Sequence, residues 1–435
     1  MERRGVGLWG AVAIGIGGMV GGGIFAVLGV VATHAGGGAP LAFLVAGAVA
    51  LLTASSYARL SVAYPNRGGS VVFIDRVFGV GIATGALNNL LWFGYLVTLA
   101  LYAVAFGSYA ATFFTQTGQA APQWLLHVLI SLAIIVPTGL NLLGAASVAR
   151  TETVVVGVKL AILVVVGAIG MTTVDTTRLA VGTWPPLPTI VAAGMLIFVA
   201  YEGFELITNA AEDIRQPRRT LPRALYISVG TVIVLYVAIA VVTVGSLTPQ
   251  QIGSAADFAL AQAAQPSLGH VGFVMVAVSA VLATLSAINA TLYGTARLSY
   301  SIAREGELPE LFERRIWSEP IGLFMTATLA LVFANLLDVA SISSIASAGF
   351  LIVFGAVNAA ALRAGTAIGA NRILAAAGLA GCTGALLVLS IDTARNRPAA
   401  LVLLIGILGA SLLGEAFWLR HRRVLRLDGN RGSVG

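Results

Sequence analysis

Residues 15–25 spell Gly-Ile-Gly-Gly-Met-Val-Gly-Gly-Gly-Ile-Phe, and this stretch decides the fold. It lies inside an apolar run over residues 6–32, which is long enough to cross a bilayer as a helix. Its six glycines destabilise such a helix, because each loosens the backbone. Freed amide and carbonyl groups are not tolerated against lipid, but where they line a cavity they can bind a ligand.

The alternative explanation for these glycines is a close contact between two helices, for which small residues suffice. Gly18 and residues 21–23 do not lie on one helical face, so we favour the break. The stretch therefore predicts a discontinuous membrane helix whose bare amides meet an anionic group.

The composition is that of a polytopic membrane protein. Apolar residues make up 58% of the chain, charged residues 10%, and the mean hydropathy is +0.93, which excludes an ordinary soluble domain. The single cysteine, Cys382, excludes an internal disulfide and a cysteine-rich metal site. We attribute the net charge of +7 to arginines in short loops and expect no nucleic-acid partner.

Hydropathy predicts twelve membrane spans. They cover residues 7–33, 39–63, 77–115, 122–142, 145–171, 188–212, 220–246, 268–303, 320–337, 340–363, 372–392 and 398–420. With this division most loop arginines fall on one side of the membrane, and only Arg178, Arg395 and Arg397 fall on the other. The positive-inside rule then places both termini in the cytoplasm and the chain in the cell membrane.

A second interrupted span occurs at the sixth position, where residues 194–205 carry two acids and a glycine at membrane depth. Breaks in spans one and six are typical of a transporter built from two inverted five-helix repeats with a site at the midplane. We therefore expect the first repeat over residues 1–171 and the second over 188–363. Peripheral helices eleven and twelve would cover 372–420, and a cytoplasmic tail 421–435.

Lys159 lies near the middle of the fifth span and is the only lysine among twenty-five basic residues. Arginine keeps its proton in proteins, whereas a buried lysine can release one. A lysine that reaches to the interface is the alternative, but this one is about nine positions inside its span. We interpret Lys159 as a proton carrier held by backbone carbonyls of a broken helix.

Glu202 and Glu205 lie one helical turn apart at the second break. They are candidates for binding a cation, carrying a proton, latching a gate or selecting substrates by charge. A water-exposed pair at the mouth of a cavity is the alternative. The four histidines have no metal-ligand spacing with cysteine or acid, so we predict no metal site.

At these residues the chain resembles the amino acid–polyamine–organocation superfamily, and within it the bacterial and archaeal amino-acid permeases. The resemblance lies in four pieces, at residues 17–25, 198–205, 216–224 and 289–309. It implies an all-α membrane protein with the leucine-transporter-like inverted repeat of five plus five helices. More narrowly, the chain is similar to a proton-coupled, broad-specificity branch in which a fifth-span lysine replaces the sodium of relatives. Lys159 matches that lysine.

The resemblance also implies site residues. The amides of Val20, Gly21, Gly22 and Gly23 would bind the substrate carboxylate, and the carbonyls of Phe198, Ala200 and Tyr201 its ammonium. The partners of Lys159 would be carbonyls near Gly17 and Val20 and a hydroxyl of span eight. The branch's serine position holds Ala283 here, so Thr284 or Ser286 would substitute. Glu202 departs from the family, which usually has an apolar residue there.

We therefore expect a secondary active transporter that carries amino acids with protons, without a cofactor. An exchanger and a sodium-coupled or polyamine carrier of the same fold remain alternatives. A membrane enzyme would need a nucleophile–base or metal constellation, and the sequence shows none. A nutrient sensor that does not transport is the remaining alternative, which uptake into proteoliposomes would test.

Overall fold

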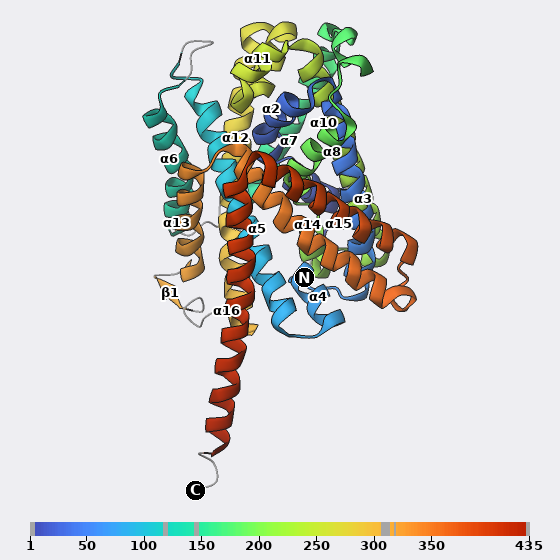
Figure 1. Cartoon of the computed structure of the whole chain (residues 1–435), viewed down its shortest axis with the longest axis vertical. Helices are drawn as coiled ribbons and strands as arrows, with labels where there is room; N and C mark the ends of the chain where they lie inside the picture. The colour runs from blue at the N-terminus through green and yellow to red at the C-terminus, as the bar shows by residue number, and fades with distance from the viewer. Residues whose placement is uncertain (1–4, 116–120, 143–147, 306–313, 317–318, 432–435) are drawn as a thin grey trace.

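The computed structural model describes residues 5–115, 121–142, 148–305, 314–316 and 319–431. Helices make up almost all of this part of the chain, as Figure 1 shows. The exceptions are two-residue strands, β1 (Arg315–Ile316) and β2 (Glu319–Pro320), which pair antiparallel, and an isolated bridge between Val6 and Ile214. The expected all-α architecture is confirmed.

The first predicted span is broken within the glycine-rich stretch. Helix α1 (Leu8–Met19) ends where Val20 leaves helical geometry, and α2 (Gly23–Ala35) begins three residues later. The sixth predicted span is divided in the same way into α8 (Leu187–Leu196), the 3-10 turn η5 (Phe198–Tyr201) and α9 (Leu206–Asn209). Its two parts meet at a bend of 54°.

Helices also form the other predicted spans, and all of these but the kinked α12 (Ala259–Glu305) are continuous. They are α3 (Ala39–Ala63), α5 (Ile82–Ala111), α6 (Gln123–Leu142), α7 (Val148–Gly170), α10 (Pro217–Ser246), α12 (Ala259–Glu305), α13 (Ile321–Leu336), α14 (Val339–Ala364), α15 (Arg372–Asn396) and α16 (Pro398–Arg431). Two short helices, α4 (Ser70–Phe78) and α11 (Pro249–Ser254), connect them, together with the 3-10 turns η1 (Gly36–Gly38), η2 (Met171–Thr173), η3 (Thr176–Leu179), η4 (Val181–Thr183), η6 (Ala211–Asp213), η7 (Ala256–Phe258) and η9 (Gly365–Ile368).

Helix ends follow from local chemistry. The carboxylate of Asp338 caps α14 by accepting from the amide of Ser341 at 2.8 Å, and Asn371 caps α15 in the same manner. Pro217 stands in the first turn of α10, where its missing N–H costs nothing. Helix α12 is kinked at Gly269, whose φ of +63° suits glycine, and the predicted span over 268–303 corresponds to the part from this kink onward.

Each predicted span coincides with a helix or a broken helix pair. By length and composition, nine helices of the described chain can cross a membrane, or ten if the bent pair α8–α9 counts as one span. One of the nine runs from Gly23 through Ala63 and so joins α2 to α3. The count of twelve therefore stays a prediction.

The two broken helices lie at the centre of the bundle. Nearly every residue of α2 is buried, as is the stretch 195–205. Helix α10 packs against α3 and α1, and α5 packs against α12 and α14. Helices α6 and α13 lie side by side at one flank, and α16 runs down the outside of α5 (Figure 1). The interrupted segments are thus enclosed by continuous helices.

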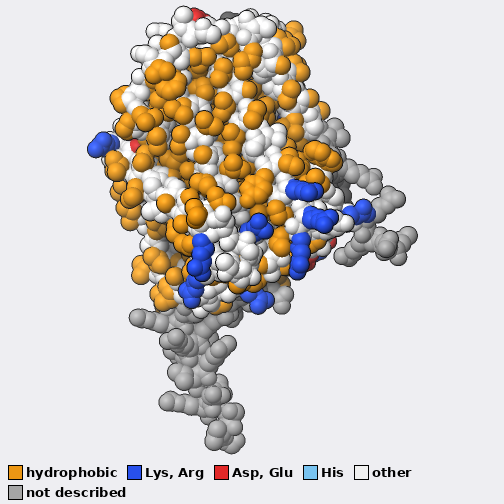
Figure 2. All heavy atoms as spheres, turned by 90° about the vertical axis from the view of Figure 1, so that its right-hand side faces the viewer, with side chains coloured by type: hydrophobic (Ala, Val, Ile, Leu, Met, Phe, Trp, Pro, Cys, Tyr) orange, Lys and Arg blue, Asp and Glu red, His pale blue; other side chains and the backbone are white. Residues whose placement is uncertain are grey.

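The outer surface suits a lipid environment with one basic end. Apolar side chains cover the upper part of the face in Figure 2, and most of its arginine side chains gather toward the lower end. The start of α1 and the end of α16 both point to that end (Figure 1).

Helix α16 runs on to Arg431, past the expected limit at residue 420. Three parts of the predictions lie outside the described residues. They are residues 1–4 with Arg3 and Arg4, residues 432–435 of the tail, and Leu308–Pro309 of the eighth-span motif.

Candidate functional site: two broken helices beside a buried lysine

The first break frees backbone groups at both of its ends. The last carbonyls of α1 and the first amides of α2 have no partner within their own helices. The amide of Val20 still bonds to the carbonyl of Ile16 at 2.8 Å, so the break proper spans residues 20–22. The start of α2 also carries the positive end of its helix dipole. This arrangement suits an anionic group, because N–H donors and the dipole act together.

The second break is held open by two serines of α14. Ser347 accepts from the amide of Val199 at 2.9 Å and donates to the carbonyl of Leu196 at 2.8 Å. Ser343 donates to the same carbonyl at 2.6 Å. These hydroxyls replace the bonds that a continuous helix would have made, which is the compensation that a break at membrane depth needs.

The two breaks touch through their backbones at Gly18 and Gly203. A Cβ atom on Gly18 would lie 2.7 Å from the carbonyl oxygen of Gly203. Gly203 has φ of +112°, and a Cβ there would lie 2.5 Å from the carbonyl carbon of Gly18. Only glycine fits both positions, since a side chain on either would drive the backbones apart.

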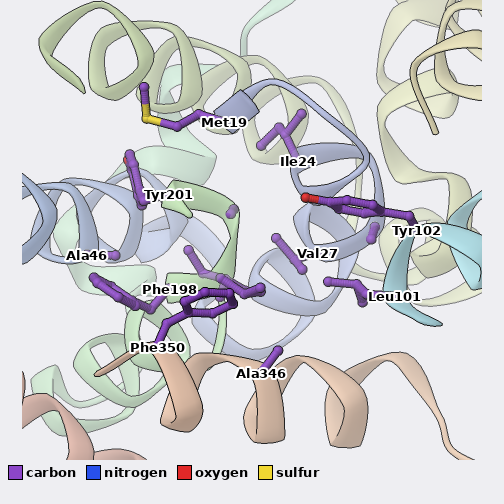
Figure 3. Packing of buried hydrophobic residues seen from close by; sticks show 14 of the residues in the cluster. Met19, Ile24, Val27, Ala46, Leu101, Tyr102, Phe198, Tyr201, Ala346 and Phe350 are labelled. Atoms are coloured by element: carbon purple, nitrogen blue, oxygen red, sulfur yellow. The ribbon is translucent and has the colours of Figure 1, made fainter. Parts of the chain in front are cut away.

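The predicted substrate residues come together around these breaks, and all are buried. The ring of Tyr102, from α5, lies against Gly22, and Gly23 packs on Ala200 of η5, where a Cβ would come within 3.1 Å of its Cα. Figure 3 shows Tyr102 reaching toward the start of α2, with Phe198 and Tyr201 on the other side of the interior. Sequence reasoning missed Tyr102, although a tyrosine in the middle of an apolar span is a visible signal.

A cavity of about 440 Å³ leads from the basic end of the molecule toward this interior. Its lining includes Arg67, Tyr95, Glu202, Asn209, Thr291 and Arg297. Arg67 forms ion pairs with Glu212 at 3.3 Å and Asp213 at 3.4 Å. None of the predicted carboxylate- and ammonium-binding residues lines the cavity, although the neighbouring Glu202 does. The described structure is therefore open toward the basic end and closed around the breaks.

The two acids at the second break have different surroundings. Glu205 accepts from the amide of Gly203 at 2.8 Å with one oxygen and from the Tyr95 hydroxyl at 3.0 Å with the other. Glu202 lines the cavity, is 5% exposed and accepts from the Tyr102 hydroxyl at 3.3 Å. Glu205 is thus hydrogen-bonded to the backbone of the break, while Glu202 lines the cavity.

Lys159 lies beside the first break. The residue is 2% exposed, and its ammonium donates to the carbonyl of Gly17 in α1 at 3.1 Å. Gly17 is one of the two carbonyl positions that the resemblance implied. On α12, the hydroxyl of Thr284 donates within its own helix, to the carbonyls of Ala280 at 2.7 Å and Val281 at 3.0 Å. The lysine therefore links α7 to α1 across the membrane interior.

Ala283 is fully buried in α12, and Ser286 is half-buried. No metal-binding group of three or more His, Cys, Asp or Glu side chains exists within the described ranges. The two breaks and Lys159 thus bring backbone amides, backbone carbonyls and a buried amine together at the centre of the bundle.

Comparisons with known proteins agree with this arrangement. The family model described as "Amino acid permease" matches residues 6–407. An uncharacterized protein of Methanocaldococcus jannaschii is 36% identical over 81% of this chain and 81% of its own. The inner membrane transport protein YbaT of Escherichia coli is 36% identical over 82% of this chain and 83% of its own.

The backbone is also similar to the crystal structure of a manganese transporter from Eremococcus coleocola. The TM-score is 0.62 at 11% identity, over 95% of this chain and 94% of that one. At this identity the likeness concerns the fold alone, and it confirms the expected leucine-transporter-like architecture with two discontinuous helices.

Proposed function

This chain belongs to the amino acid permease family and is an amino-acid transporter of the membrane, and on that premise we propose that it moves amino acids together with protons. The observation that carries the proposal is the hydrogen bond from Lys159 to the carbonyl of Gly17 at 3.1 Å. It joins an ionisable group that is 2% exposed to the end of the broken helix. Loss of the proton would remove the charge that draws α7 to α1.

The physical basis is linkage between two binding events. The same α1–α2 break supplies the carbonyl that holds Lys159 and the amides proposed for the substrate carboxylate. A change in the separation of α1 from α7 therefore changes the binding of both the proton and the substrate. Proton binding and substrate binding must then shift each other by equal factors.

The substrate site proposed here lies between the two breaks. The carboxylate would lie on the amides of residues 21–23, at the positive end of α2, because the amide of Val20 already donates to the carbonyl of Ile16. The ammonium would lie on carbonyls of the η5 segment, with Phe198 and Tyr201 beside the side chain. Partners of both signs are needed, because a zwitterion carries both charges into the low-dielectric interior.

Transport would follow from alternating access to this site. The cavity opens at the basic end, which the positive-inside rule assigns to the cytoplasm. Along α2, beyond the break, the 3-10 turn η7 packs directly on Gly29. The described conformation then corresponds to a carrier that is closed to the outside.

The direct test is uptake into proteoliposomes that contain the purified protein. A panel of labelled amino acids is supplied with an imposed proton gradient, an imposed sodium gradient or neither. We expect uptake that the proton gradient drives and that ignores sodium. Uptake that requires a counter-substrate inside the vesicle and ignores both gradients would identify an exchanger and overturn the proton-coupled proposal.

A further inference from the structure

Tyr236 connects the two broken helices through one hydroxyl. The residue belongs to α10 and is fully buried. Its hydroxyl donates to the carbonyl of Met19 at 2.7 Å and reaches the carbonyl of Ala200 at 3.2 Å. A tyrosine hydroxyl has one proton, so both carbonyls share a single donor in a three-centre arrangement.

Both acceptors are groups that the breaks set free. Met19 is the last residue of α1, and its carbonyl has no amide partner within that helix. Ala200 lies in η5, among the carbonyls assigned to the substrate's ammonium. The ring of Tyr236 is held in place by Phe43 at 5.7 Å and Tyr201 at 5.3 Å between centroids. The hydroxyl therefore lies where two bare acceptors converge.

We propose that the hydroxyl proton of Tyr236 occupies the ammonium position while the site is empty and yields these carbonyls to the ammonium of the substrate. The proposal rests on the proposed amino-acid site and adds a residue from α10 to it. A buried acceptor without a donor is costly, so a closed empty site needs a substitute for the ammonium. Tyr236 supplies that substitute from α10, which belongs to neither broken helix.

The proposal has an unusual consequence for Tyr236→Phe. In the wild type, the ammonium of the substrate takes the place of the Tyr236 hydroxyl as the donor to these carbonyls, so the number of unsatisfied acceptors does not change. In the variant, the carbonyls of Met19 and Ala200 lack that donor until the substrate arrives, so the ammonium contributes more to binding. The amino group should therefore raise affinity in the variant about tenfold more than in the wild type, by the usual cost of an unsatisfied buried group.

The test measures two ligands on two proteins at fixed pH. The labelled ligand is the amino acid that is taken up best. Unlabelled samples of that amino acid, and of the carboxylic acid that lacks its amino group, compete with it, and the competition gives the affinity of each. For L-alanine, the pair is alanine and propionate. Tyr109→Phe is the matched control, because Tyr109 is equally buried and its hydroxyl donates to the carbonyl of Phe25 inside the intact helix α2 at 3.3 Å.

The measured quantity is the affinity for the amino acid divided by the affinity for the carboxylic acid that lacks the amino group. Relative to the wild type, we expect this ratio to be about tenfold larger in Tyr236→Phe and unchanged in Tyr109→Phe. Should Tyr236→Phe not yield folded protein, Tyr236→Met removes the donor as well and should give the same result. Equal weakening of both ligands would identify Tyr236 as a structural residue and overturn the inference alone. Failure of the wild type to bind any amino acid would overturn the proposed function and this inference with it.

Discussion

At the residue scale, Gly203 is a position that does not tolerate a side chain. Its φ of +112° and its contact with the backbone of Gly18 both exclude a Cβ atom. We expect Gly203→Ala to destabilise the fold by about 1–3 kcal/mol, the usual cost of a non-glycine residue in such a conformation. The melting temperature of the detergent-solubilised protein measures the effect.

Gly230→Ala is the control for this change. Gly230 lies in α10, and a Cβ atom there would meet nothing within 4 Å. Alanine is the better helix former, so the control should be neutral or slightly more stable. A melting temperature for Gly203→Ala that matches that of Gly230→Ala would contradict the close approach of the two breaks.

Glu202 gives a prediction about selectivity. Because Glu202 lines the cavity while both oxygens of Glu205 are occupied, a substrate's side-chain cation would meet Glu202 first. We expect arginine to compete better than its neutral isostere citrulline. Glu202→Gln should reduce that preference about tenfold, the typical weight of a hydrogen bond to a charged group.

Glu205→Gln serves as the matched control, since it removes a buried carboxylate one turn away without changing the cavity lining. In this control, the apparent affinity for arginine relative to that for citrulline should stay unchanged. If Glu202→Gln also leaves this ratio unchanged, Glu202 does not contact the substrate side chain.

At the element scale, the break in the sixth span depends on α14. Ser343 and Ser347 provide the hydrogen bonds for Leu196 and Val199 that a continuous helix would have provided. Replacing both serines by alanine leaves a buried amide and a buried carbonyl without these partners. We expect a loss of stability of about 1–3 kcal/mol per group and a corresponding fall in melting temperature.

Ser344→Ala is the control on the same helix. The hydroxyl of Ser344 donates only to the carbonyl of Ala340 in its own helix, at 2.7 Å, so its removal frees no group of the break. The double variant should melt well below this control. Equal melting temperatures would mean that the break is stabilised by groups other than these serines.

Much of the element-scale picture could be predicted from the sequence. Long apolar runs predicted the helices, since a bilayer demands about 20 apolar residues per span, and the glycines of residues 15–25 predicted the first break. The continuation of α16 to Arg431 was not predicted, because hydropathy detects only the apolar part of a helix. The two inverted repeats over 1–171 and 188–363 remain a prediction.

The partners within the site were harder to predict. Ser347 lies 148 residues from Val199, and Tyr236 lies 217 residues from Met19. Such contacts depend on how each helix is rotated about its axis, and a uniformly apolar span carries little information about rotation. Lys159 was visible because it is chemically unlike every other basic residue of the chain, whereas Tyr102 and Tyr236 are tyrosines among other aromatic residues.

At the scale of the whole molecule, the cavity opens toward one side while a lysine links α7 to the broken helix α1. Glu202 lines the cavity, whereas the proposed substrate groups are buried and do not line it. Movement between the two open states must therefore change the contacts of α1 and α2 with the helices around them. Lys159 is the ionisable group placed to make that movement depend on protons.

The most direct test of this central claim is the pH dependence of uptake by Lys159→Arg in proteoliposomes, beside wild type and Lys159→Ala. Wild-type uptake should rise as the external pH falls. Lysine can cycle between charged and neutral forms, whereas arginine stays charged in proteins, so both variants should lose pH-driven uptake although Lys159→Arg keeps the positive charge. Normal transport by Lys159→Arg with the pH dependence of the wild type would contradict the account, and it would make Lys159 a structural cation and Glu205 the next candidate for the proton.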